Sequence, residues 1–194
     1  MIFKNLKDYR IILASGSPRR QDLMKQLGLE FDVITRPVEE IFPEGMKGEE
    51  IAIYLSKLKA DAFDESFFQE SVLLITADTV VCLNDEVLGK PLDREDAINI
   101  LTRLSGKMHK VITGISIRTA NKKVNFVANT DVYFKQLSKE EIIYYVDNYK
   151  PFDKAGAYGI QEWIGYIGVE EIKGSFYNVM GLPIQKLYEE LMKF

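Results

Sequence analysis

The stretch VLLITADTVVCL, Val72–Leu83, decides the fold because it is the most apolar run in the chain. A run rich in Val, Ile, Leu and Thr predicts a strand, and one this apolar is typical of a strand covered on both faces. Asp78 interrupts it with a carboxylate, which is costly inside an apolar strand unless it is paired or holds a metal. The alternative is that Asp78 faces solvent at a strand end, with Thr79 as a local partner.

Helical and extended patterns alternate on both sides of this strand, which is typical of the α/β class. We expect further strands at Arg10–Ala14, Phe31–Ile34, Lys110–Arg118, Lys123–Phe134 and Ile167–Ile172. We expect helices at Pro18–Leu27, at 47–64, from Asp93 to Ser105, from Ser138 to Asn148 and from the GLP motif at 181–183 to Phe194. Residues 110–134 read as a hairpin, so we predict a mixed, twisted sheet flanked by helices in one domain spanning 1–194.

Charge and composition exclude several classes of protein. The net charge is −4, whereas a general nucleic-acid binder carries a basic excess, so we expect no nucleic-acid partner. Cys82 is the only cysteine, which rules out an internal disulfide and suits a reducing compartment. Residues 1–10 mix charged and apolar side chains, and no apolar run reaches the ~18 residues of a membrane span. We therefore expect a cytoplasmic protein that does not contact membranes.

The sharpest local motif is SGSPRR, Ser15–Arg20. Ser17 suits a helix N-cap and Pro18 the first helical position. Arg19 and Arg20 then lie in the first turn, where the helix dipole disfavours cations. A bound anion would reverse that sign, because it would meet backbone amides, serine hydroxyls and two guanidinium groups together. Nucleotide phosphates fit this description, although a capped helix with two solvated arginines fits it equally well.

Carboxylates suit magnesium, which takes one or two of them together with substrate phosphates. Asp78 could supply one such ligand, and Glu39 or Glu40 another, although a solvated acidic loop explains the two glutamates without a metal. Lys90 lies in LGKP, which is not a Walker motif, and by itself an ordinary turn lysine explains it better than a phosphate ligand does. Lys59 lies on a helix flank and by itself indicates only a surface charge.

Gln161 ends the glycine-bearing stretch DKAGAYGIQ, residues 153–161. Glycines permit close approach of the backbone to a ligand, and the amide can both donate and accept, as a pyrimidine edge requires. A tight turn between two elements explains the stretch equally well. His109 is the only histidine, and since nothing in the sequence places a nucleophile beside it, we interpret it as structural.

Six motifs occur in one order: SGSPRR, ADTVV, LGKP, LSGKMHKVITG, DKAGAYGIQ and GSFYNVMGLP. Together, from about residue 11 to about residue 190, they resemble the Maf family of nucleotide pyrophosphatases. The resemblance implies a fold like that of inosine triphosphate pyrophosphatases, with two lobes and a central cleft for the substrate. It also implies hydrolysis of a nucleoside triphosphate between the α and β phosphates, with Mg²⁺ or Mn²⁺. The branch that resembles this chain in its KAGAYGIQ motif acts on dTTP and UTP.

The resemblance also implies roles for individual residues. The residues that would grip or neutralise phosphates are Ser15, Arg19, Arg20, Lys59 and Lys90. Asp78 would be the catalytic acid/base carboxylate and, with Glu40, a metal ligand, whereas Arg19, Thr79 and Gln161 would set specificity. Two departures stand out. The acidic loop reads Val-Glu-Glu where Asp-Glu is more usual, and Glu162-Trp163 stand where a glycine-richer run is expected.

A second class of function is compatible with the same residues. The Maf family carries an older name as a septum-formation inhibitor, so the chain could be a non-catalytic, nucleotide-binding regulator of cell division. A sensor could dispense with the Asp78 carboxylate, so the complete set of Asp78, Lys90 and both arginines favours catalysis. For assembly, base rates favour a homodimer.

Overall fold

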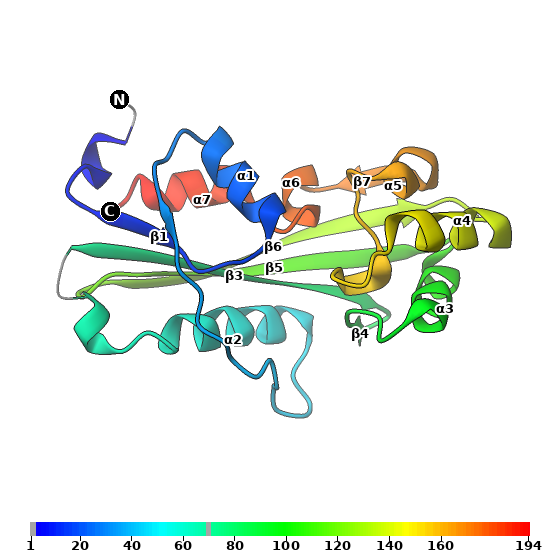
Figure 1. Cartoon of the computed structure of the whole chain (residues 1–194), viewed down its shortest axis with the longest axis horizontal. Coiled ribbons are helices and arrows are strands. Elements are labelled where there is room, and N and C mark those ends of the chain that lie inside the picture. The colour runs from blue at the N-terminus through cyan, green and yellow to red at the C-terminus, as the bar shows by residue number, and fades with distance from the viewer. Residues whose placement is uncertain (1–2, 69–70) are drawn as a thin grey trace. The chain divides into compact units, whose positions relative to one another are not determined.

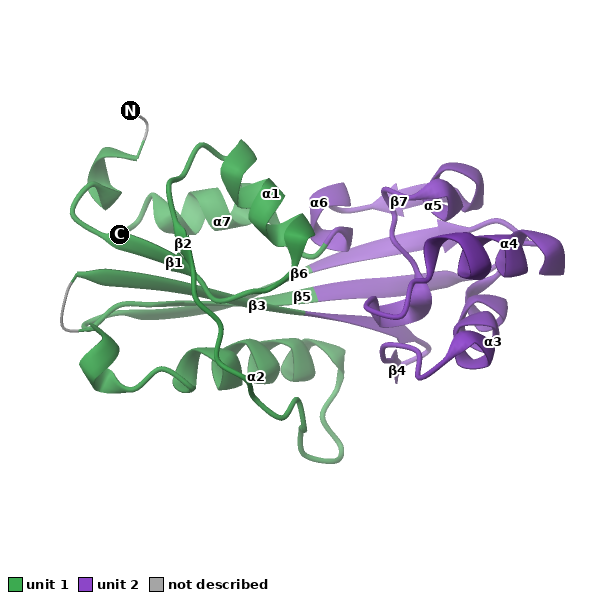
Figure 2. Ribbon diagram, viewed as in Figure 1, with its two compact units in different colours: residues 1–78, 113–128, 181–194 green, residues 79–112, 129–180 purple. Residues whose placement is uncertain are grey.

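A computed structural model describes residues 3–68 and 71–194 (Figure 1). Within these residues the chain forms a seven-stranded sheet with the order β2-β1-β3-β5-β6-β7, and β4 pairs with β3. The chain divides into two compact units (Figure 2). Unit 1 comprises 1–78, 113–128 and 181–194, and unit 2 comprises 79–112 and 129–180. The predicted α/β class with a mixed sheet is confirmed.

The elements have the following bounds. The strands are β1 (Arg10–Leu13), β2 (Asp32–Val33), β3 (Val72–Leu83), β4 (Glu86–Leu88), β5 (Met108–Arg118), β6 (Lys123–Phe134) and β7 (Val169–Lys173). The helices are α1 (Pro18–Gln26), α2 (Gly48–Asp61), α3 (Arg94–Leu104), α4 (Lys139–Tyr149), α5 (Trp163–Gly168), α6 (Phe176–Val179) and α7 (Ile184–Leu191). Short 3₁₀ turns occur at Lys4–Leu6, Glu65–Phe68 and Ala155–Ala157.

Three segments differ from the sequence predictions, one of them the short helix α6, which was not expected. Residues 163–168 form α5, so the strand expected from Ile167 begins only at Val169. The six residues WIGYIG have low helix propensity, and the packing of Ile164 in the core of unit 2 stabilises the helix instead. The hairpin strand β4 was not predicted; it follows the turn at Asn84 and Asp85, whose φ values of 51° and 67° suit a tight hairpin.

Unit 1 is built on parallel strands. β1 pairs in parallel with β2 and with β3, and Leu13 lies opposite Ile75. Figure 2 shows α1 and α7 on one face of this sheet and α2 on the other. β1 ends opposite Ile75, whereas β3 continues to Leu83, so the parallel pairing of the two strands stops partway along β3. In open α/β sheets, ligands bind where parallel strands end. Ser15 lies two residues, and Asp78 three residues, beyond the last parallel pair, Leu13 and Ile75.

The position of α2 on the sheet depends on Gly114 of β5. A Cβ atom added at Gly114 would lie 2.2 Å from the carbonyl oxygen of Ala52, so the two backbones are in direct contact. The hydroxyl of Thr76 adds a second link, since it donates to the carbonyl of Ser56 at 2.6 Å. These two contacts fix the position of α2, and therefore of its side chains, relative to β3 and β5.

Unit 2 has its own core, formed by α3, α4, α5 and the adjoining strands. Ser138 caps the predicted helix α4 through a capping box, in which Ser138 accepts from the amide of Glu141 and Glu141 accepts from that of Ser138. The segment Lys154–Gln161 lies against the LGKP turn, because the Gly156 amide donates to the Gly89 carbonyl at 3.1 Å. In the parts of the chain that the structure describes, no helix has the length and apolarity that a membrane crossing requires.

Candidate active site

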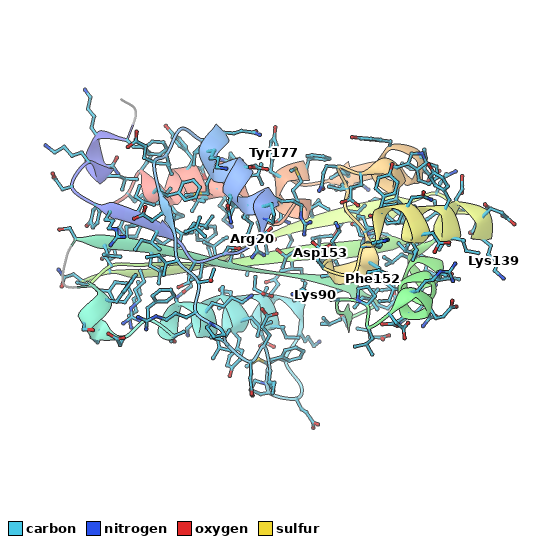
Figure 3. The ribbon with its side chains drawn as sticks, viewed as in Figure 1. Arg20, Lys90, Lys139, Phe152, Asp153 and Tyr177 are labelled. Atoms are coloured by element: carbon cyan, nitrogen blue, oxygen red, sulfur yellow. The ribbon has the colours of Figure 1, made fainter. Side chains whose placement is uncertain are left out.

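Arg20 lies in the first turn of α1 (Figure 3), and backbone carbonyls hold its guanidinium. Nε donates to the carbonyl of Gly181 at 2.7 Å, and Nη1 donates to the carbonyl of Ala77 at 2.8 Å. Burial lowers the pKa of Arg20, and the nearby carboxylates of Asp78 and Glu40 oppose that shift. A guanidinium stays protonated in proteins, so Arg20 holds a permanent positive charge against the carbonyl of Ala77, the residue before Asp78.

The loop before α1 adopts the predicted start, with Ser17 at the N-cap and Pro18 in the first turn. The Ser17 side chain makes no capping hydrogen bond; instead its amide donates to Oγ of Ser15 at 3.3 Å. The same Oγ accepts from Nη1 of Arg20 at 3.3 Å. Ser15 is buried, so its hydroxyl joins the loop to the guanidinium rather than facing solvent.

Lys59, in the last turns of α2, binds two carboxylates. Its Nζ lies 2.5 Å from Oδ1 of Asp78 and 2.9 Å from Oε1 of Glu40. The side chains of Lys59 and Asp78 are 17% and 9% exposed, whereas that of Glu40 is 42% exposed. Asp78 is thus buried and paired, and the alternative of a solvent-facing strand end is wrong. Of the two loop glutamates, Glu40 is the one that contacts Lys59.

The Lys59 contacts also test whether these residues fit a divalent metal. An ammonium group is bound by Glu40 and Asp78 together, so oxygen atoms from both carboxylates converge on one cationic centre. Among the described residues no group of three or more His, Cys, Asp or Glu side chains could hold a metal. Two carboxylates suit Mg²⁺, which completes its shell with water and substrate phosphates. The donor set therefore fits magnesium or manganese.

Lys90, Thr79 and Gln161 belong to unit 2 (Figure 3 labels Lys90). Lys90 is exposed and Thr79 is half-buried. Oε1 of Gln161 is buried and has no hydrogen-bond partner within the described chain. The Gly89–Gly156 hydrogen bond joins the turn that carries Lys90 to the segment that ends at Gln161. Two of the predicted motifs are therefore neighbours in this unit.

The remaining candidates are structural in character. His109 is buried, its Nε2 lies 2.7 Å from the hydroxyl of Tyr158, and its ring packs edge-on against Phe134. Burial lowers the pKa of His109 to about 4. Cys82 is buried in β3, and burial raises the pKa of its thiol, so it behaves as a small apolar side chain.

Sequence reasoning missed the groups that position Arg20. They are the carbonyls of Ala77 and Gly181, and a carbonyl has no residue signature in a sequence. It also missed Gln21, whose amide donates to the carbonyl of Ser15 at 3.2 Å. The GLP motif was the one available signal, since its Gly181 adopts a φ of 111°, which favours glycine.

Comparison with solved structures supports the fold. A HAM1 protein from Coxiella burnetii has a TM-score of 0.52 at 15% identity, covering 96% of this chain and 100% of that one. The Ham1 protein of Staphylococcus aureus has a TM-score of 0.50 at 20% identity, with coverage of 93% and 99%. At these identities the likeness concerns the fold alone, and it confirms the expected mixed α/β fold.

Sequence comparisons are more specific. A dTTP/UTP pyrophosphatase of Bacteroides thetaiotaomicron is 58% identical over 190 residues, covering 97% of this chain and 98% of that protein. A dTTP/UTP pyrophosphatase of Parabacteroides distasonis is 52% identical over 194 residues, covering 100% of both chains. The family model described as Maf-like protein matches residues 10–194. On this match and on these two full-length relatives, the chain belongs to the Maf family.

Proposed function

We propose that this chain hydrolyses dTTP and UTP between the α and β phosphates, giving the nucleoside monophosphate and pyrophosphate. Two relatives that are more than half identical over their whole length carry the name dTTP/UTP pyrophosphatase. The observation that carries the proposal is the arrangement in unit 1. Arg20 binds the carbonyl of Ala77, and the next residue is the carboxylate Asp78, which contacts Lys59 and through it Glu40.

The arrangement supports a separate role for each of these side chains. Lys59 donates to Oδ1 of Asp78, and we assign Oδ2 to a water molecule that attacks the α-phosphorus. Asp78 orients this water and accepts its proton, as a positioned general base does. Arg20 and Arg19 neutralise charge that develops on the phosphate oxygens, and fixed cations achieve this at low reorganisation cost. Ser15 positions Arg20 through its hydroxyl.

Glu40 and Asp78 would hold the divalent cation, Mg²⁺ or Mn²⁺. When bound, the cation would supply charge neutralisation to the triphosphate and to the departing pyrophosphate. Lys59 contacts both carboxylates, so in its absence the buried Asp78 would lack its nearest positive charge. We assign Lys59 the task of keeping the two carboxylates together before substrate arrives.

Three residues of unit 2 complete the proposal. Lys90 is assigned to the phosphates, Thr79 to substrate selection, and Gln161 to the uracil or thymine edge. Gln161 is suited to that task because its buried Oε1 has no protein donor within the described chain, and the ring N3–H of uracil and thymine is a donor. We further propose a cytoplasmic homodimer whose partner is the nucleotide, without nucleic acid or membrane.

One assay tests the proposed function. The purified chain is incubated with dTTP or UTP and MgCl₂, and nucleoside monophosphate and pyrophosphate are quantified by chromatography. Equimolar release of the two products is expected, because cleavage at the α–β bond yields both. Binding of dTTP without any product would instead support a non-catalytic nucleotide-binding regulator of cell division. Release of orthophosphate and dTDP would place the cleavage at a different bond and refute the proposal.

A further inference from the structure

Gln161 lies in a turn that a second layer of side chains holds in place. The amide of Glu162 donates to the carbonyl of Gly159 at 3.0 Å, and this hydrogen bond closes the turn around Gln161. The amide of Gly159 donates in turn to the hydroxyl of Tyr145 on α4, at 3.0 Å. The hydroxyl of Tyr145 donates to Oε2 of Glu162. One hydroxyl therefore ties both ends of the turn together.

Glu162 is also bound to the start of the same segment. Its Oε1 lies 3.2 Å from Nζ of Lys154, which lies 2.7 Å from the carboxylate of Asp153 (labelled in Figure 3). Lys154 is buried and Tyr145 is fully buried, so their contacts with Glu162, whose side chain is 20% exposed, are largely shielded from water and worth more than exposed ones. A glycine at position 162 could supply none of them.

The segment between Lys154 and Glu162 needs such support because its backbone is strained. Gly156 and Ala157 have φ values of 71° and 58°, and a non-glycine residue rarely adopts the left-handed region. The carboxylate of Glu162 also presses against Gly159, where an added Cβ would lie 2.7 Å from Cδ of Glu162. These contacts restrict the backbone of the turn to one conformation.

A fixed turn matters because an amide can read a pyrimidine in two ways. Uracil and thymine present a ring N3–H donor, whereas cytosine presents a bare N3 acceptor beside an amino donor. A side-chain amide that rotates by half a turn satisfies either edge, so Gln161 discriminates only if its orientation is held. Its buried Oε1 has no partner within the described residues, and it matches the donor of uracil and thymine.

We propose that Tyr145 and Glu162 are positioning residues that hold Gln161 so that the site prefers uracil and thymine to cytosine. This inference rests on the proposed function, since it concerns the same base-reading residue. Neither side chain is assigned any contact with the nucleotide. Both act through the turn at 159–162, which Tyr145 contacts at Gly159 and at Glu162 and which Glu162 also links to Lys154.

The test compares Tyr145→Phe and Glu162→Ala with the wild type by measuring kcat and KM for UTP and for CTP. The ratio of kcat/KM for UTP to kcat/KM for CTP is expected to fall about five- to tenfold, which is the effect of losing the one hydrogen bond between Gln161 and the base. The fall is expected to come from a higher KM for UTP, with kcat for UTP changed by about twofold or less. Glu162→Gln keeps an acceptor for Tyr145 and is expected to retain most of the preference. Tyr144→Phe is the matched control, because Tyr144 lies on the same helix and is 49% exposed.

A merely structural role would lower kcat/KM for UTP and CTP by the same factor, and that result would overturn the inference. An unchanged ratio in Tyr145→Phe would overturn it as well. If the wild type hydrolyses neither dTTP nor UTP, the proposed function fails, and calorimetric binding of UMP and CMP then decides the inference separately. A preference for UMP that Tyr145→Phe reduces would support positioning, whereas equal or undetectable binding of UMP and CMP by the wild type would refute it.

Discussion

The ammonium group of Lys59 lies 2.5 Å from the carboxylate of Asp78, and this contact joins α2 to the middle of β3, three residues beyond its last parallel pair with β1. Both side chains are largely buried. Removing one partner of a buried ion pair is strongly destabilising, and Glu40 contacts the same ammonium group as a third member.

Lys59→Met is expected to destabilise the protein by about 2–3 kcal/mol, because it leaves a buried carboxylate without its counter-charge. Millimolar MgCl₂ is expected to raise the Tm of this variant more than that of the wild type, since a cation can then replace the lost ammonium group. Thermal unfolding with and without MgCl₂ measures both effects. Lys57→Met is the matched control, an exposed lysine on the same helix. Equal shifts for Lys59→Met and the wild type would contradict the idea that Glu40 and Asp78 accept a cation.

Asp78→Asn is expected to lower kcat for dTTP by about 10²–10⁴, the usual effect of losing a positioned general base. The amide keeps the size of the side chain and can still accept from Lys59, so nucleotide binding is expected to change much less than turnover. Pyrophosphate release and calorimetric titration with dTMP separate the two quantities. Pyrophosphate release at the wild-type rate would show that Asp78 does not act as the base.

Much of the fold is predictable from local sequence patterns. The bounds of β3 match the apolar run Val72–Leu83 because polar and turn residues flank it on both sides. Likewise, α3 and α4 begin where Asp93 and Ser138 provide capping side chains. In contrast, the short helix α5 is stabilised by tertiary packing rather than by propensity, so its sequence suggested no helix.

The candidate site is harder to predict from the sequence than the fold is. Lys59 is separated by 19 residues from Asp78, and on a helix flank it carries no pattern that marks it as a partner. The packing of α2 on Gly114 and the hydrogen bond from Thr76 to Ser56 hold α2 where Lys59 reaches Asp78. The carbonyls that hold Arg20 come from Ala77 and Gly181, which are far apart in the chain and have no distinctive side chain.

Gly114→Ala is expected to destabilise the protein by about 3 kcal/mol or more, because the new methyl group would overlap the backbone of Ala52. Relief requires α2 to move away from β5, and the same movement would displace Lys59 from Asp78. Urea unfolding measures the loss of stability. Gly16→Ala is the matched control for stability, since nothing lies within 4 Å of a Cβ added there. Gly16→Ala is expected to raise the stability by about 1 kcal/mol or less, and a change as small as this in Gly114→Ala would show that α2 tolerates displacement.

The buried imidazole of His109 is expected to make stability depend on pH. Its pKa is lowered to about 4 in the folded protein, from an unfolded value near 6.5, because burial disfavours the charged form. The contribution of the neutral imidazole to the free energy of unfolding is therefore complete above about pH 6.5 and is lost as the pH falls towards 4. The loss between pH 7 and pH 5 amounts to about 2 kcal/mol. His109→Gln keeps a polar group beside Tyr158 but does not titrate. Urea unfolding at the two pH values should show a smaller pH-dependent loss in the variant, by about 2 kcal/mol, and identical losses would mean that protonation of His109 is not coupled to unfolding.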